Sequence, residues 1–180
     1  MAEKIKQAHA FASAAHKDQT RKFTGELYLK HLEETAQLLW EATDGNASQD
    51  MYIAAILHDV VEDTDVTLEE VGREFGGLVM TLVGELTIDQ KAKEEEGKKL
   101  HLTRKINGMS EPAFLIKLCD RFSNVSGLMD RRIPDKFVKW YVKETQYILE
   151  HLDRRLTETQ ENLTKKIGQM LVYLKLDRNF

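Results

Sequence analysis

The segment from Ile53 to Thr64, IAAILHDVVEDT, constrains the fold of this chain more than any other. Its apolar residues point in most directions around a helix, which predicts a helix that is largely buried. Four polar side chains interrupt this apolar run: His58, Asp59, Glu62 and Asp63. Because carboxylates are almost never buried without a partner, we expect them to face an enclosed cavity. The alternative is a helix end with solvated acids and one hydrogen-bonded core histidine, against which the apolar flanks argue.

The spacing within this segment pairs its polar side chains. His58 and Glu62 are four residues apart, as are Asp59 and Asp63, so on a helix each pair shares one face. A neutral imidazole nitrogen beside a carboxylate oxygen suits Mn, Fe, Co or Zn. We therefore expect His58 and Asp59 to bind a divalent cation. Glu62 and Asp63, one turn further on, are then placed for general acid and base chemistry beside the metal.

Two further residues complete a set of ligands. His31 lies near the start of an expected helix, and Asp120 lies within the apolar run LIKLCDRFSNV. Either residue alone is also compatible with an ordinary core or surface position. Together with His58 and Asp59 they make two histidines and two carboxylates. Such a set leaves positions open for water and substrate oxygens, as a metal-dependent hydrolase requires.

The rest of the chain is expected to be helical. Apolar stripes at helical spacing and end signals place helices at about residues 2–16, 29–42, 48–63, 67–75, 78–86, 137–151 and 155–176, with an apolar segment after Pro112. The mostly charged residues 89–107 predict a solvated helix or a mobile lid. We predict an all-α fold, a single-domain helical bundle over residues 1–180. Its site core spans about residues 8–129, and its C-terminal helices span about residues 135–176.

Charge and composition limit the classes of partner. A formal net charge of -4 excludes a strongly basic nucleic-acid-binding domain, so we expect no nucleic-acid partner. No apolar run approaches the roughly 20 residues that span a bilayer, and the N-terminal residues lack a signal-peptide core, so we expect no membrane partner. The single cysteine, Cys119, fits a reducing, cytoplasmic compartment. The helix from Arg155 to Leu176 offers a face for a homodimer.

The order His…His-Asp…Asp, carried by QTRKFTGELYLKH, AAILHDVVEDT and LIKLCDRFSNV, resembles the HD-domain metal-dependent phosphohydrolases. Within them it is similar to the hydrolase domain of the RelA/SpoT alarmone enzymes and their small stand-alone forms. The resemblance spans about Ala8 to Met129, and VVEDT is its most specific part. It implies an HD-type helical bundle that removes the 3′-pyrophosphate from guanosine tetra- or pentaphosphate. It also implies Mn2+ as cofactor, with Fe, Co, Zn or Mg as alternatives, and Glu62 and Asp63 acting on the attacking water.

The resemblance further implies contacts to a small phosphorylated nucleotide. In these families an Arg-Lys pair before the first metal ligand approaches the base, and an Asn four residues after the last Asp contacts the sugar-phosphate. Here these positions are Arg21, Lys22 and Asn124. Arginine suits base stacking and bidentate phosphate contacts, and lysine suits a point-charge contact. A solvated basic turn is the alternative interpretation of the Arg-Lys pair.

Three residues depart from the family pattern. Phe23 stands where a small residue is common, Leu27 where proline is usual, and Ser123 where His or Tyr is frequent. Phe23 and Leu27 lie in the loop expected to bind the base, so two other functions stay open. One is hydrolysis of another nucleotide or phosphorylated metabolite, such as a nucleoside monophosphate or NADPH. The other is a regulator that binds nucleotide or metal without turnover, against which the intact Glu62 and Asp63 argue.

Overall fold

The computed structural model describes residues 2–89, 94 and 97–180. Within these residues the regular structure is helical, apart from an isolated antiparallel bridge between Thr20 and Leu27. In chain order the helices are α1 (Ala2–Ala15), α2 (Tyr28–Ala42), α3 (Gln49–Ile56), α4 (Val60–Asp63), α5 (Leu68–Phe75), α6 (Gly77–Leu86), α8 (Lys98–Gly108), α9 (Glu111–Gly127), α10 (Asp135–Glu150) and α11 (Glu158–Asp177). The predicted all-α fold class is confirmed.

Local sequence signals determine where several helices begin and end. The Ser48 hydroxyl accepts a hydrogen bond from the Met51 N–H at the start of α3, and Thr67 and Glu70 form the capping box that opens α5. Gly76 separates α5 from α6 with a φ of 100°, a conformation that side chains other than glycine rarely adopt. These ends lie where the sequence predicted them.

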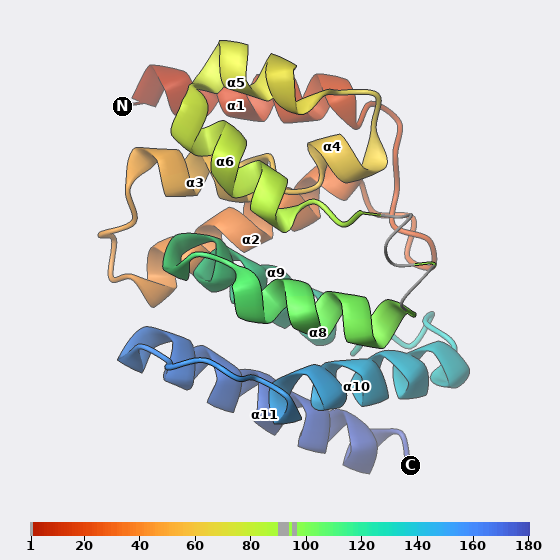
Figure 1. Cartoon of the computed structure of the whole chain (residues 1–180). Coiled ribbons are helices and arrows are strands. Elements are labelled where there is room, and N and C mark those ends of the chain that lie inside the picture. The colour runs from red at the N-terminus through yellow and green to blue at the C-terminus, as the bar shows by residue number, and fades with distance from the viewer. Residues whose placement is uncertain (1, 90–93, 95–96) are drawn as a thin grey trace.

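Helix α9 lies at the centre of the molecule. It contacts α2, α3, α6, α10 and α11. In Figure 1 it lies between the α1 and α5 end of the molecule and the opposite end, which α10 and α11 form. Most of its side chains are buried, including Phe114 and Ile116 at 0% exposure. A charged residue on such a helix is surrounded by protein on several sides, and Asp120 is in this position.

The segment that carries His58 differs from the expected continuous helix. Helix α3 ends at Ile56 and α4 begins at Val60, so Leu57, His58 and Asp59 form a turn between them. The prediction of one helix from about residue 48 to 63 is therefore wrong. On a regular helix, adjacent side chains point about 100° apart. The turn instead allows His58 and Asp59 to face the same point.

Helix α8 corrects a second expectation, that the charged segment is solvated. Leu102 and Ile106 of this helix are buried, with 2% and 3% exposure. The helix therefore has an apolar face against the core, while Lys99 and Arg104 are exposed. Residues 90–93 and 95–96 of the same charged segment lie outside the described residues. In the described part of the chain, no helix is both long and apolar enough to cross a membrane.

Candidate metal centre

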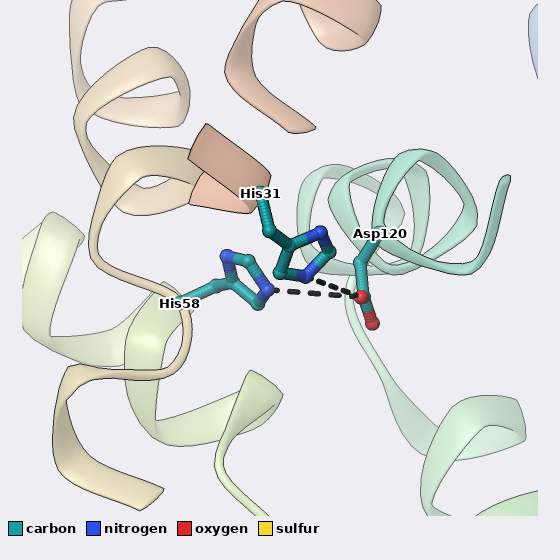
Figure 2. Close-up of side chains that lie close together, drawn as sticks. All are labelled: His31, His58 and Asp120. Carbon is teal, nitrogen blue, oxygen red and sulfur yellow. Dashed lines mark ion pairs between the residues drawn. The ribbon is translucent and has the colours of Figure 1, made fainter. Parts of the chain in front are cut away.

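Side chains from three separate parts of the chain converge next to α9. His31 on α2, His58 in the turn after α3 and Asp120 on α9 each offer one ligand atom, and these atoms all lie within 4.8 Å of one another (Figure 2). Asp120 Oδ1 is 3.3 Å from His31 Nε2 and 3.7 Å from His58 Nε2. Asp59 Oδ2 approaches the same nitrogens, at 3.8 Å from His31 Nε2 and 3.1 Å from His58 Nε2. The structure thus brings together all four residues that the sequence singled out as ligands.

Hydrogen bonds orient both histidines toward this point. His58 Nδ1 donates to the Ala55 carbonyl at 2.8 Å, so in the neutral ring that binds a metal ion the lone pair is on His58 Nε2. That Nε2 is buried and has no hydrogen bond of good geometry among the described residues. His31 Nδ1 lies 3.0 Å from the Ser123 hydroxyl, which in turn donates to Glu34 at 3.1 Å. Such outer contacts select the tautomer that presents Nε2 to a metal ion.

The charges around the cluster favour a cation. Burial lowers the pKa of His58, but Asp59 and Asp120 outweigh burial and raise this pKa to about 10. Burial raises the pKa of both carboxyl groups, but His58 for Asp59 and Lys117 for Asp120 lead the contacts that bring them below their usual range. The site therefore stabilises positive charge next to two imidazole nitrogens. Two nitrogens and two carboxylate groups are a donor set that fits a divalent metal ion.

Two residues that were not predicted from the sequence contact the carboxylates. Lys117 is buried, and its Nζ lies 2.7 Å from Asp120 Oδ2. The Tyr28 hydroxyl donates to Asp59 Oδ2 at 2.7 Å. Spacing was the available signal, because Lys117 precedes Asp120 by three residues on α9 inside an apolar run, and a buried lysine requires a carboxylate partner. Tyr28 contacts a residue 31 positions away, which spacing does not predict.

Glu62 and Asp63 both lie on α4, directly after the turn that carries His58 and Asp59. Glu62 Oε2 accepts a hydrogen bond from the Ile88 N–H at 3.1 Å. Burial raises the pKa of Glu62, and burial together with the Asp59 charge raises the pKa of Asp63. Raised pKa values make both carboxylates stronger bases at neutral pH.

Arg21 and Asn124 are linked to the metal cluster by hydrogen bonds. An Arg21 guanidinium N–H donates to Asn124 Oδ1 at 2.7 Å, and Asn124 Nδ2 donates to Asp120 Oδ1 at 2.5 Å. Asn124 therefore orients a carboxylate of the cluster, a contact that the resemblance did not imply. These two contacts use one N–H and one oxygen lone pair of the Asn124 amide, which has two of each.

A cavity of about 1190 Å³ opens beside the cluster. Arg21, Lys22 and Asn124 line it, and Tyr28 and Ser123 form its boundary with the metal cluster. The four ligand residues and the two acids of α4 do not belong to its lining. The predicted nucleotide-contacting residues therefore share one cavity, and Tyr28 both lines this cavity and donates a hydrogen bond to Asp59.

Phe23, which departs from the family pattern, also lines this cavity. The centre of its ring lies 4.9 Å from the ring centre of Phe137 on α10, and the Lys22 ammonium lies 5.5 Å from the Phe23 ring centre. The cavity thus has an aromatic wall next to its basic residues. Such a wall can accommodate the flat face of a nucleotide base.

Comparison with known proteins places these residues in a family. The family model described as the HD domain matches residues 8–158, a range that contains the whole cluster. The chain belongs to the HD domain family. Together with the buried donor set, membership of this family assigns a divalent metal ion to the HD-domain cluster.

Curated relatives and a solved structure narrow the branch of the HD domain family. The guanosine-3′,5′-bis(diphosphate) 3′-pyrophosphohydrolase MESH1 of Homo sapiens is 34% identical over 177 residues, which cover 93% of this chain and 96% of that protein. The 3′-pyrophosphohydrolase of Aquifex aeolicus is 37% identical over 157 residues, but this HD-domain chain spans only 22% of its length. The solved structure of a metazoan orthologue of SpoT, described as hydrolysing ppGpp, has a TM-score of 0.81 at 27% identity and 94% coverage of both chains. The resemblance to RelA/SpoT-type hydrolases is confirmed.

Proposed function

We propose that this protein is a metal-dependent hydrolase that removes the 3′-pyrophosphate from guanosine tetra- or pentaphosphate. The observation that carries the proposal is the cluster of His31, His58, Asp59 and Asp120, whose residues His58 and Asp59 directly precede the helix that carries Glu62 and Asp63. Human MESH1, which is named for this reaction, is similar to the chain over nearly its whole length. This similarity supports the choice of substrate.

We propose Mn2+ as the ion held by His31, His58, Asp59 and Asp120, with Fe, Co, Zn or Mg as alternatives. The mixed nitrogen and oxygen donors support a first-row transition metal. When bound, the ion neutralises charge on the phosphoryl oxygens and lowers the pKa of a water molecule. Asn124 and Lys117 keep the Asp120 carboxylate in place, and Tyr28 does the same for Asp59.

Glu62 and Asp63 act on the attacking water in this proposal. One carboxylate accepts a proton from water while the water oxygen forms a bond to phosphorus. The bond between that phosphorus and the ribose 3′ oxygen breaks, the 3′ oxygen takes up the proton from the acid pair to become the 3′ hydroxyl, and pyrophosphate that carries the water oxygen is released. Burial raises the pKa values of both acids, so each holds an accepted proton better than a solvated carboxylate would.

Arg21, Lys22 and Asn124 bind the nucleotide in the adjacent cavity. Arg21 uses one side of its guanidinium group on Asn124, and its remaining N–H groups are available for phosphate or base contacts. Lys22 is exposed and adds a point charge at the cavity wall. These assignments place the nucleotide on the Tyr28 side of the cluster.

The test is release of pyrophosphate from guanosine tetraphosphate by the purified chain with added Mn2+, compared with the Glu62→Gln, Asp63→Asn double variant. We expect release by the wild type and a loss of at least about 100-fold in the variant, because general acid and base catalysis contributes about 10²–10⁴-fold. Mn2+ affinity should persist in the variant. Asp59→Ala should lose both Mn2+ binding and turnover.

A substrate panel separates the remaining functions. No release from guanosine tetraphosphate, but turnover of NADPH or a nucleoside monophosphate, would keep the enzyme and change its substrate. The aromatic wall formed by Phe23 and Phe137 is the feature that would favour such a change. Binding of Mn2+ and nucleotide without turnover of any member of the panel would identify a regulator.

We also propose a homodimer and a cytoplasmic location. Helix α11 leaves Val172, Tyr173 and Leu176 exposed, at 57%, 51% and 73%, and this face supports pairing of two copies. Light scattering of the purified chain would measure a doubled mass if this proposal is correct. The free, buried thiol of Cys119 supports a reducing compartment.

A further inference from the structure

His16 is a buried histidine that the proposed mechanism does not use. It directly follows α1, and its side chain is only 4% exposed. Its Nδ1 is hydrogen-bonded to Gln19 Oε1, and because an amide oxygen only accepts, Nδ1 is the donor. Its Nε2 is buried without a hydrogen-bond partner among the described residues. The polar edge of this ring is therefore fixed by Gln19, and its faces are available for packing.

One face of the His16 ring lies on Tyr28. The two ring centres are 5.1 Å apart and the ring planes differ by 21°, which is a stacked arrangement. Tyr28 then meets His31 edge to face, at 5.7 Å and 74°. The Tyr28 hydroxyl donates to Asp59 at 2.7 Å. His16 is thus one side chain removed from two residues of the metal cluster.

Backbone hydrogen bonds join the same residues. The Gln19 N–H donates to the His16 carbonyl at 3.0 Å, and the Tyr28 N–H donates to the Gln19 carbonyl at 2.9 Å. The loop between Gln19 and Tyr28 carries Arg21 and Lys22. His16 therefore lies where this loop closes, between the nucleotide-contacting residues and the metal cluster.

We propose that His16 is a positioning residue, which holds the Tyr28 hydroxyl on Asp59 through ring stacking and its hydrogen bond to Gln19. This inference rests on the proposed function, because Asp59 acts there as a metal ligand. A stacked ring restricts rotation of the Tyr28 side chain, and Gln19 prevents the His16 ring from turning away. Without His16 the phenol gains freedom, and Asp59 loses a fixed donor.

Asp63 of α4 is also affected by the charge of Asp59. Burial and the Asp59 charge raise the pKa of Asp63, so Asp63 is electrostatically linked to the carboxylate on which the Tyr28 hydroxyl lies. Displacement of Tyr28 would therefore disturb Asp63 as well as Asp59. For this reason we expect loss of His16 to affect kcat more than KM.

Three substitutions separate the contacts of His16. His16→Asn keeps an amide nitrogen close to the position of Nδ1 but removes the ring that stacks on Tyr28. His16→Phe keeps the ring and removes the bond to Gln19. Tyr28→Phe removes only the hydroxyl group. The matched control is His151→Asn at the end of α10, because His151 is exposed and stacks on Tyr147 at 3.9 Å and 22°, away from the cluster.

The experiment measures the Mn2+ dissociation constant by calorimetry, and kcat and KM for guanosine tetraphosphate, on the complete chain. We expect His16→Asn to weaken Mn2+ binding and to lower kcat by about tenfold each, with a smaller change in KM. His16→Phe should recover part of both losses, and His151→Asn should change neither. Circular dichroism and thermal unfolding verify that each variant is folded.

The decisive comparison is the double variant. If His16 acts through the Tyr28 hydroxyl, adding His16→Asn to Tyr28→Phe should change Mn2+ affinity and kcat by less than about twofold. Independent effects that multiply would overturn the proposal, as would a His16→Asn chain with wild-type values. If His16→Asn does not fold, the same comparison of single and double variants is made with His16→Phe and Tyr28→Phe.

The two readouts keep the positioning role and the proposed function apart. Coupled losses of Mn2+ affinity in a chain without turnover would support the role of His16 and reject the hydrolase. Wild-type turnover without coupling would support the hydrolase and reject the role of His16. A wild-type chain that binds no Mn2+ would overturn both.

Discussion

At the residue scale, the charged groups of the cluster are held by specific neighbours. Asp120 forms an ion pair with Lys117, with 2.7 Å between Nζ and Oδ2, and accepts a hydrogen bond from Asn124 Nδ2 at 2.5 Å. Asp59 accepts a hydrogen bond from the Tyr28 hydroxyl. Charges in a buried site are stable only when such partners are present. The carboxylates therefore keep a fixed geometry before any ligand arrives.

The pH dependence of turnover follows from the acids of α4. Burial raises the pKa of Glu62 above its ordinary 4.5 and that of Asp63 above 3.8. A base acts only when deprotonated, so kcat should fall as pH drops through these raised values. The acid limb of the kcat profile should then lie above pH 4.5 if Glu62 is the base, and above pH 3.8 if Asp63 is the base. Pyrophosphate release at saturating Mn2+ measures the acid limb, with circular dichroism at each pH as the folding control. A limb at or below pH 4.5 would exclude Glu62 as the base, and one at or below pH 3.8 would exclude both acids.

At the scale of elements, the end of α6 positions Glu62, one of the two proposed catalytic acids. Ile88 follows the last turn of this helix, and its N–H donates to Glu62 at 3.1 Å. A backbone donor cannot rotate away as a side chain can. Glu62 is thus positioned by a different element from the one that carries it.

Ile88→Pro tests this contact, because proline removes the N–H. Thr87, with φ -66° and ψ 128°, already has the extended conformation that a residue before proline adopts. A hydrogen bond to a charged group contributes about 1.5–3 kcal/mol, so we expect kcat to fall by about tenfold or more. Ile88→Ala is the control, since it shortens the side chain and keeps the N–H. Equal kcat values for the two variants would show that the backbone donor has no role.

At the scale of the whole molecule, the cluster joins parts of the chain that are distant in sequence. Its residues come from α2, from the turn before α4 and from α9, which is the helix at the centre of the fold (Figure 1). An ion bound there would contact all three elements at once. Metal binding is therefore coupled to the stability of the folded state.

Mn2+ should consequently raise the free energy of unfolding. At a free concentration 100 times its dissociation constant, one site contributes about 2.7 kcal/mol. Chemical denaturation with Mn2+ and with a chelator measures the difference. His58→Ala should show little difference between the two conditions, because it lacks a ligand. A metal-dependent gain of the same size in His58→Ala would place the bound ion elsewhere.

The local sequence determined the helices, several of their caps and the residue types of the site. Apolar periodicity and end signals act within a few residues, so the ends at Ser48, Thr67 and Gly76 could be predicted without a fold. The ordered His…His-Asp…Asp pattern singled out His31, His58, Asp59 and Asp120 for the same reason. None of these predictions required a distance between remote parts of the chain.

Only the tertiary structure decided how these residues meet. The chain forms a turn at Leu57–Asp59 in which Leu57 and His58 are buried, whereas the local sequence favoured one continuous helix. The contact of Tyr28 with Asp59 and the burial of His16 depend on how α1 and α2 approach α3. Hydrogen bonds between distant residues form only after the helices have packed, and therefore local periodicity carries no signal for them.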